Sequence, residues 1–236
     1  MALVFAPVSV ALADNPNVAT KKAGIEAKGY VWNDQSGGEK IEALHKTGDV
    51  KNGKEAYEVC SACHLPSGAG RPDGTFPQLA GQHATVIIKQ IADIREGLRD
   101  NPTMYPFAKT LSDAQELADV AAYIQTLCIP LDHGKGSGDA ALLAKGKELY
   151  VKECTTCHGK NGEGDAKKFY PVLAGQHYKY LLRQVTDIRD GKRRNANPDM
   201  VKIVKKYSNA DLDAVVEYMS SLSMPGHMCK AGPAKH

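Results

Sequence analysis

Features that would assign this chain quickly to a class of protein are scarce. Aromatic residues make up 6% of the 236 residues, and the formal net charge is only +3. No basic run is interleaved with aromatic residues, which excludes the usual signature of a nucleic-acid-binding protein. No apolar run reaches the roughly 20 residues of a membrane-spanning helix, and no run alternates as a strand does. We therefore expect an all-α globular protein whose core has few aromatic side chains.

Two short cysteine motifs are the strongest signals in the chain. Cys60–His64 and Cys154–His158 both read Cys-x-x-Cys-His, the pattern that attaches c-type haem. The two thiols add to the haem vinyl groups, and the histidine supplies one axial nitrogen to the iron. A structural zinc site would need four ligands from closer motifs, whereas these lie 94 residues apart. We predict two haem c groups, each also supplying apolar surface to its domain, with Cys60, Cys63, Cys154 and Cys157 as attachment points and His64 and His158 as iron ligands.

The surroundings of the motifs repeat as well. Phe76–His83 returns as Tyr170–His177, and Gln90–Arg95 returns as Gln184–Arg189, both at an offset of 94 residues. Such agreement at one offset indicates a duplicated domain. We predict a first domain over residues 49–131, a flexible glycine-rich linker over 132–138 and a second domain over 139–236.

Helical signals recur in both copies. Asp49 and Asp139 stand where an N-cap would begin a first helix. Ser112 and Gln115 resemble a capping box that opens a last helix. Apolar residues at helical spacing predict a middle helix in each copy, namely Ile87, Ile91, Ile94 and Leu98 in the first and Leu181, Val185 and Ile188 in the second.

The second axial ligand decides what each iron can do. A methionine sulfur closes the site for electron transfer, whereas an open site would bind small molecules. Met104 lies 40 residues after His64, and Met200 lies 42 residues after His158, each in a Pro-containing loop between two helices. We expect these two thioethers to be the second ligands, because thioethers suit haem iron in a redox carrier.

Two repeated residue pairs accompany these ligands. His83 and His177 are the rival second ligands, but each directly precedes a helix, so we favour a capping role or a place near the haem propionates. Pro77 and Pro171 each follow the motif histidine by 13 residues. Their carbonyls are placed to accept the other ring N–H of that histidine, which would fix its tautomer.

The remaining cysteines and the N-terminal region leave alternatives open. Cys128 and Cys229 could form an internal disulfide, remain free thiols or bridge two molecules. Residues 1–13 are apolar and end in Ala11-Leu12-Ala13, which indicates the remnant of an export signal cleaved after Ala13, although the run could also stay on. Residues 14–48, which contain Trp32, would then be an extension that packs loosely on the first domain or docks a partner.

Charge is divided unequally between the halves. Residues 1–130 hold 12 Lys and Arg against 15 Asp and Glu, whereas residues 131–236 hold 18 against 12. This division is either ordinary scatter or a dipole that presents different faces to an electron donor and an electron acceptor.

Taken together, these motifs resemble the diheme class I cytochromes c, most closely the cytochrome c4 type. The resemblance covers about residues 49–225, including both haem motifs, both Pro-x-Leu-Ala-Gly-Gln segments and both methionine loops. It implies two all-α class I domains, His/Met ligation and periplasmic electron transfer. The chain departs from the pattern at Leu65, where the family usually has glycine and the second copy keeps Gly159.

The resulting expectation is a periplasmic electron carrier rather than an enzyme. It would relay electrons from a respiratory or dehydrogenase donor to an acceptor such as a terminal oxidase, with no transmembrane segment and no catalytic residue. The alternatives are a cytochrome subunit of a periplasmic dehydrogenase complex, or a diheme peroxidase or thiosulfate-oxidising enzyme with one displaceable ligand.

Overall fold

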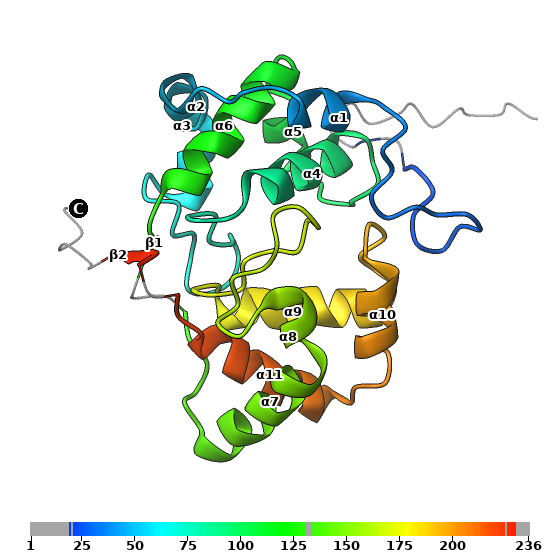
Figure 1. Cartoon of the computed structure of the whole chain (residues 1–236), viewed down its shortest axis with the longest axis vertical. Coiled ribbons are helices and arrows are strands. Elements are labelled where there is room, and N and C mark those ends of the chain that lie inside the picture. The colour runs from blue at the N-terminus through cyan, green and yellow to red at the C-terminus, as the bar shows by residue number, and fades with distance from the viewer. Residues whose placement is uncertain (1–18, 20, 131–133, 225, 230–236) are drawn as a thin grey trace, which may run out of the picture.

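Two bundles of helices lie one above the other in a computed structural model of the chain (Figure 1), which describes residues 19, 21–130, 134–224 and 226–229. The first bundle contains α2 (Val50–Ala56), α3 (Glu58–His64), α4 (Ala84–Arg95), α5 (Tyr105–Ala108) and α6 (Ala114–Thr126). The second contains α7 (Ala140–Glu153), α8 (Thr155–His158), α9 (Tyr178–Arg189), α10 (Pro198–Val204) and α11 (Asn209–Ser221). The order of helices is the same in both bundles, as the repeat predicts.

The first and last helices of each bundle cross at a glycine. A Cβ atom on Gly53 would lie 1.9 Å from the carbonyl oxygen of Asp119 in α6, and one on Gly146 would lie 1.9 Å from that of Ala214 in α11. Glycine is therefore required at both positions for the helix backbones to approach this closely.

Helix starts agree with the sequence in part. Asp49 accepts hydrogen bonds from the backbone of Lys51 and Asn52, and Asp139 does the same at α7, which confirms both predicted caps. The capping box expected at Ser112 and Gln115 is wrong, because Asp113 caps α6 instead.

A true capping box opens α11 in the second bundle. The Ser208 Oγ accepts from Asp211 N, and the Asp211 carboxylate accepts from Ser208 N. The predicted middle helix of the first bundle is too long at its C-terminal end, because α4 ends at Arg95 and does not include Leu98.

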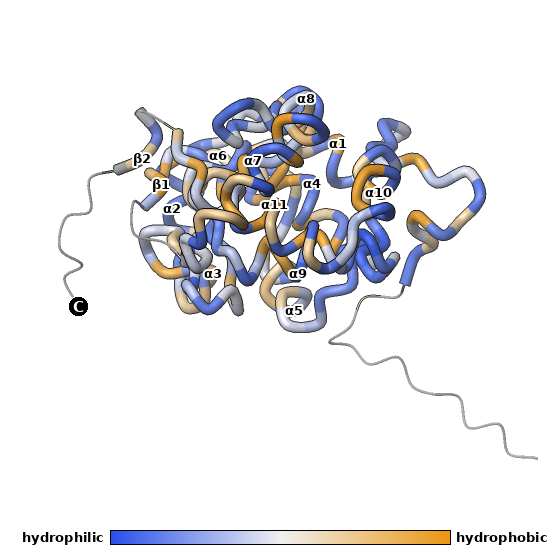
Figure 2. Tube along the Cα trace, turned by 90° about the horizontal axis from the view of Figure 1, so that it is seen from below, coloured by the Kyte–Doolittle hydropathy of each residue, from blue (hydrophilic) through white to orange (hydrophobic). Residues whose placement is uncertain are grey.

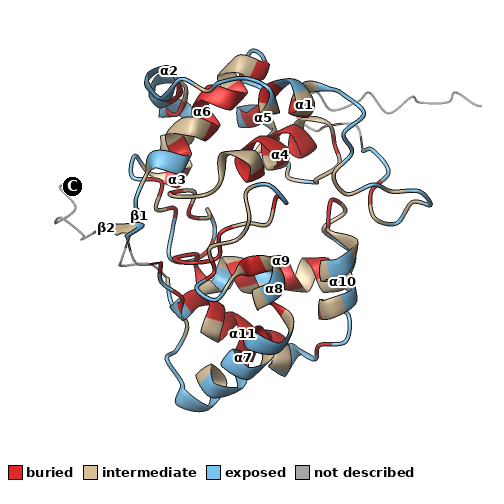
Figure 3. Cartoon of the chain, viewed as in Figure 1, coloured by how far each residue is buried: buried red, intermediate tan, exposed pale blue. Residues whose placement is uncertain are grey.

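Each bundle has its own apolar core. Hydrophobic and hydrophilic residues alternate along the helices (Figure 2), and buried residues gather along α4, α6, α9 and α11 (Figure 3). Leu117, Val120 and Ala121 of α6 are fully buried, as are Ala214 and Val216 of α11. In the first bundle α6 packs against α2 and α4, and in the second α11 packs against α7 and α9.

The chain between the bundles is held in place rather than free. Ser137 and Gly138 donate backbone hydrogen bonds to the Glu217 carboxylate, and Gly136 N donates to Ser220 Oγ. A Cβ on Gly136 would lie 2.0 Å from that carboxylate. The described part of the predicted flexible linker is thus a fixed strap, because its glycines let backbone N–H groups reach a buried carboxylate.

A short parallel strand pair lies beside the strap. β1 (Ile129–Pro130) pairs with β2 (Met228–Cys229), and Ile129 is fully buried in the core of the second bundle. Cys128 is disulfide-bonded, while the side chain of Cys229 lies outside the described part of the chain. The expected absence of long strands holds for the described residues, since each of these two strands has two residues.

The N-terminal extension contacts both bundles. Its helix α1 (Glu39–Leu44) packs on α4 and α6, and Glu39 pairs with Arg95 at 3.0 Å. Residues nearer the N-terminus also reach the second bundle, where Ile25 N donates to Arg194 O at 2.7 Å. The expectation of loose packing on the first domain alone is therefore wrong.

Two further expectations concern the export signal and membrane-spanning segments. The predicted signal remnant, residues 1–13, lies outside the described residues. Within the described part of the chain, no helix combines the length and apolar character needed to span a bilayer.

Candidate functional site

One cavity of about 620 Å³ runs through both bundles. Its walls contain every motif residue singled out in the sequence, namely Cys60, Cys63, His64, Pro77, Met104, Cys154, Cys157, His158, Pro171 and Met200. The remaining walls combine apolar side chains of α4, α6, α9 and α11 with polar and apolar side chains of the loops. The structure thus brings together in each half two thiols, one imidazole and one thioether, a donor set that fits one covalently attached haem.

The motif cysteines sit where the first helices end. Cys60 and Cys63 lie in α3, whereas Cys154 is the C-cap of α7 and Cys157 lies in α8. All four are free thiols. Burial raises the pKa of Cys60 to about 11 and that of Cys154 to about 12, since a thiolate would lose its hydration. Both thiols are therefore protonated at neutral pH in the folded chain.

Each motif histidine is oriented by a proline carbonyl. His64 Nδ1 donates to Pro77 O at 2.9 Å, and His158 Nδ1 donates to Pro171 O at 3.2 Å. Both histidines are buried, and the loss of hydration lowers the pKa of each, although the carbonyl hydrogen bond acts in the opposite direction. The imidazoles are therefore neutral at neutral pH, with Nε2 left to bind iron.

The two methionines lie in different local structure. Met104 directly precedes α5, and Asn101 Oδ1 accepts a hydrogen bond from its backbone N at 3.1 Å. Met200 lies within α10 rather than in a loop, because Asn197 caps that helix and Pro198 occupies its first position. Both side chains are half-buried and contact the core of their own bundle.

The repeated Gln-His pairs join the two bundles. Gln82 exchanges two hydrogen bonds with the backbone of Val172, through its Nε2 at 3.0 Å and its Oε1 at 2.9 Å. Gln176 does the same with the backbone of Gln78, at 2.9 and 3.0 Å. The two exchanges are equivalent by the repeat, so the bundles are related by an approximate twofold axis.

The histidines of these pairs bind across the same interface. His83 Nε2 donates to Glu163 O, and His177 Nε2 donates to Ala69 O, both at 2.8 Å. His177 Nδ1 also accepts from Gly134 N at 3.0 Å. Neither side chain caps its helix. The expected capping role is therefore wrong, and both residues hold the two domains together.

A polar cluster lies on the approximate axis, between the two ends of the cavity. Arg99 donates to Gln90 at 2.9 Å and to Gln184 at 3.2 Å, while Arg193 donates to Gln184 at 2.9 Å and to Gln90 at 3.0 Å. Burial, followed by the charge of Arg99, lowers the pKa of Arg193 to about 10. Neither guanidinium forms an ion pair with a described carboxylate.

The sequence predicts residues that the structure gathers around the cavity, but it does not predict this interface. The signal was present, since Gln82, His83, Gln90 and Arg99 all return 94 residues later. Repetition predicts a duplicated domain and residues that serve each copy. It also marks residues that meet their own copies across a twofold axis.

Comparison with known proteins agrees with this geometry. The cytochrome c family matches residues 50–128 and 143–223. Cytochrome c4 of Pseudomonas aeruginosa is 37% identical over 188 residues, covering 75% of this chain and 90% of that protein. The thiosulfate dehydrogenase electron acceptor of Stutzerimonas stutzeri is 35% identical over 175 residues, covering 71% and 80%.

A solved structure shares the arrangement of the two domains. The crystal structure of reduced recombinant cytochrome c4 from Pseudomonas stutzeri matches with a TM-score of 0.65 and 33% identity, covering 75% of this chain and all of that chain. Two tandem domains, each with its own haem c, are thus common to this chain and its relatives. The chain belongs to the cytochrome c family, and within it to the diheme electron-transfer proteins of the cytochrome c4 type.

Proposed function

We propose that each haem iron is held between one histidine and one methionine, His64 with Met104 and His158 with Met200. The observation that carries this proposal is the cavity wall, where each half contributes one imidazole oriented through Nδ1 and one thioether. Haem iron with this ligand pair supplies a reversible one-electron Fe(III)/Fe(II) couple. With both axial positions filled by protein, the chain passes electrons on and binds no substrate at iron.

The chain's own residues tune the two couples. The carbonyls of Pro77 and Pro171 increase the electron donation of their histidines by accepting the Nδ1 protons. The apolar walls exclude water, which favours the less charged ferrous state. Arg99 and Arg193 both line the cavity, so their positive charges would be available to balance the negative haem propionates.

An electron donor follows from the relatives. Two of them are named thiosulfate dehydrogenase electron acceptors, from Stutzerimonas stutzeri and Thiomonas intermedia. We therefore infer that a dehydrogenase of this class, or a respiratory donor, delivers electrons to the chain, and that an oxidase is the acceptor. The signal-like residues 1–13 and the disulfide at Cys128 support an oxidising compartment, the periplasm.

The ligand assignment is tested by redox titration with visible spectra on wild type, Met104→Ala and Met200→Ala. Wild type should show two reversible one-electron couples and the far-red absorption band of methionine-ligated ferric haem. Each variant should lose that band and lower the potential of one haem only. If either substitution leaves both couples unchanged, that methionine is not a ligand.

The enzyme alternative makes a different prediction for the wild-type protein. A displaceable ligand at one iron would let the reduced protein bind carbon monoxide readily. The carrier predicts no such binding until Met104 or Met200 is removed. Rapid carbon monoxide binding by wild type would favour a peroxidase or thiosulfate-oxidising enzyme.

A further inference from the structure

The N-terminal arm, residues 21–48, lies across the seam between the two domains. Figure 1 shows it in blue beside the gap between the bundles. Lys22 N donates to Gly97 O of the first domain at 3.1 Å, and Ile25 N donates to Arg194 O of the second at 2.7 Å. Two backbone hydrogen bonds a few residues apart therefore bind the arm to both domains.

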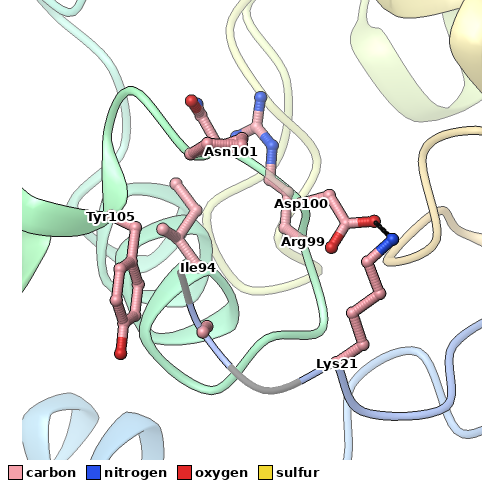
Figure 4. Close-up of a pocket in the computed structure, with 8 residues that line it drawn as sticks. Lys21, Ile94, Arg99, Asp100, Asn101 and Tyr105 are labelled. Atoms are coloured by element: carbon pink, nitrogen blue, oxygen red, sulfur yellow. Dashed lines mark ion pairs between the residues drawn. The ribbon is translucent and has the colours of Figure 1, made fainter. Parts of the chain in front are cut away.

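The docking is close enough to require glycine. A Cβ atom on Gly24 would lie 2.5 Å from the Arg194 carbonyl oxygen. The Arg194 side chain pairs with Glu26 of the arm at 3.1 Å and with Asp100 of the first domain at 3.5 Å. Lys21 reaches the same Asp100 at 3.3 Å (Figure 4). These partly exposed ion pairs contribute little and are screened by salt, so shape complementarity at Gly24 matters more.

Trp32 connects the arm to the second haem site. Its ring stacks on that of Tyr170 with a centroid distance of 6.1 Å and an interplanar angle of 24°. The Tyr170 ring lies 6.4 Å from the ring of His158, the proposed histidine ligand of the second haem iron. Of the described arm residues, Trp32 is the one that lines the cavity. The arm thus continues the wall of the second site outward from its histidine.

No described arm residue covers the first haem site in this way. Phe76 occupies the position equivalent to Tyr170, and its ring lies 6.1 Å from that of His64. No other aromatic ring faces Phe76 among the described residues. The repeat therefore supplies an internal control, in which the same position lacks the arm.

Trp32 also covers a buried charged cluster at the seam. The Lys89 ammonium lies 5.3 Å from the centre of the Trp32 ring and pairs with Asp93. Asp93 accepts a further hydrogen bond from Asn195 Nδ2 of the second domain at 2.7 Å. All three polar side chains are less than 4% exposed. Removing the indole would admit water to this cluster and to the cavity wall beside it.

We propose that the arm is a clamp over the domain seam and that Trp32 is its positioning residue, which holds Tyr170 against His158 and keeps water from the second haem. This inference rests on the proposed function, because it assigns the second iron to His158. The expected consequence is asymmetric: losing Trp32 lowers the potential of the second haem and leaves that of the first unchanged.

The experiment is a redox titration of holoprotein carrying Trp32→Ala or Trp32→Phe, with the couples assigned through Met104→Ala and Met200→Ala. Trp32→Ala should shift the second Fe(III)/Fe(II) equilibrium toward ferric iron by about threefold to tenfold, the latter being about 59 mV for a one-electron couple. Trp32→Phe, which keeps an aromatic ring, should recover most of the wild-type potential. The matched control Val31→Ala, next in the arm and 63% exposed, should change neither couple.

A second variant tests the clamp without touching the indole. Gly24→Val cannot approach Arg194 and should release the arm. Because the chain has one Trp, its fluorescence reports on the arm directly: haem quenches it when docked, and emission should rise in Gly24→Val together with the same fall in the second potential.

Several results would overturn the proposal. One is that Trp32→Ala shifts neither couple, or shifts both equally. Another is that Gly24→Val raises emission while both potentials stay at wild-type values. Failure of the proposed function looks different, since wild type itself would then lack two reversible methionine-ligated couples.

Discussion

The two halves of the molecule share the residues that meet at the twofold axis, whereas they differ in the partly exposed residues where each haem site opens to the surface. In the first half, Val59 precedes the haem motif and is 37% exposed, as is Phe107 just after Met104, and both line the cavity. In the second half, Glu153 precedes the motif and pairs with Lys206 at 2.8 Å. Duplication has thus kept the contacts that join the copies while their outer surfaces diverged.

This difference gives the two haems unequal surroundings. Among the described residues, the first has apolar Val59 and Phe107 at its opening and no aromatic ring over Phe76. The second has the Glu153–Lys206 ion pair at its opening and Trp32 over Tyr170. Burial and nearby charge both set the potential of a haem. Two copies of one domain can therefore hold distinct potentials with the same ligand types, which is what a relay with a defined direction requires.

The largest expected effect is a loss of folding stability that should be similar in the two halves. Gly53→Ala and Gly146→Ala each place a Cβ 1.9 Å from a carbonyl oxygen of the partner helix. Forcing these helices apart should lower the free energy of unfolding by about 3 kcal/mol or more in either half. Denaturant unfolding followed by far-UV circular dichroism measures it, with Lys54→Ala and Lys147→Ala, at exposed neighbouring positions, as controls. A near-wild-type midpoint for either glycine variant would contradict the equivalence of the two crossings.

The next largest effect is a loss of folding stability that should differ between the two halves. His177 binds Ala69 O across the seam and also Gly134 N of the strap, whereas the His83 ring binds Glu163 O across the seam. His177→Ala removes the partner of two partly buried backbone groups and His83→Ala that of one, so the first variant should cost about 2–3 kcal/mol against about 1 kcal/mol for the second. The same unfolding measurement decides, and equal costs would show that the Gly134 strap adds nothing to the interface.

How much could be predicted depended on how local each feature is. The Asp49 and Asp139 caps and the placement of the proline carbonyls were predictable, because each depends on a short segment read in both copies. The cap of α6 was misplaced by one residue, since Ser112 and Asp113 are both good cap residues and only the backbone distinguishes them. The usual capping-box pattern does not predict the box at Ser208, because its N3 residue is Asp211 rather than Glu or Gln.

Contacts across the seam were beyond local reading. Nothing near Gln82 in the sequence indicates that it binds the backbone of Val172, 90 residues away. The glycine content of the linker predicts flexibility. In the structure these glycines instead let the backbone N–H groups of Ser137 and Gly138 donate to the Glu217 carboxylate. Such features follow from the packing of one domain on the other, which a repeat reveals only as a set of matching residues.

A smaller effect should distinguish the halves at the end of the motif helices. Leu65 has φ 64° and ψ 155°, a region that strongly favours glycine, and Gly159 occupies the equivalent place with φ 76°. Leu65→Gly removes this strain but adds chain entropy to the unfolded state, so the free energy of unfolding should rise by about 1 kcal/mol. Gly159→Ala should lower it, since a side chain at φ 76° is strained. Thermal unfolding of both variants checks the opposite signs, and destabilisation by Leu65→Gly would show that the leucine side chain contributes more than its backbone costs.

The smallest effect belongs to the second half alone and depends on pH. Hydrogen bonds from Lys145, and then from Ser208, hold the pKa of Asp211 at about 2 in the folded chain, below its ordinary value of 3.8. A carboxyl with a depressed pKa stabilises the fold above its unfolded pKa, and that contribution disappears as pH falls from about 4 to 2. Asp211→Asn should therefore lower stability at pH 7 by less than about 1 kcal/mol, given the exposed ion pair, and by nothing near pH 2. Lys145→Ala should show the same pH dependence with a smaller amplitude, because Ser208 still bonds the carboxylate. A cost for Asp211→Asn that persists at pH 2 would mean that capping geometry, rather than charge, stabilises the start of α11.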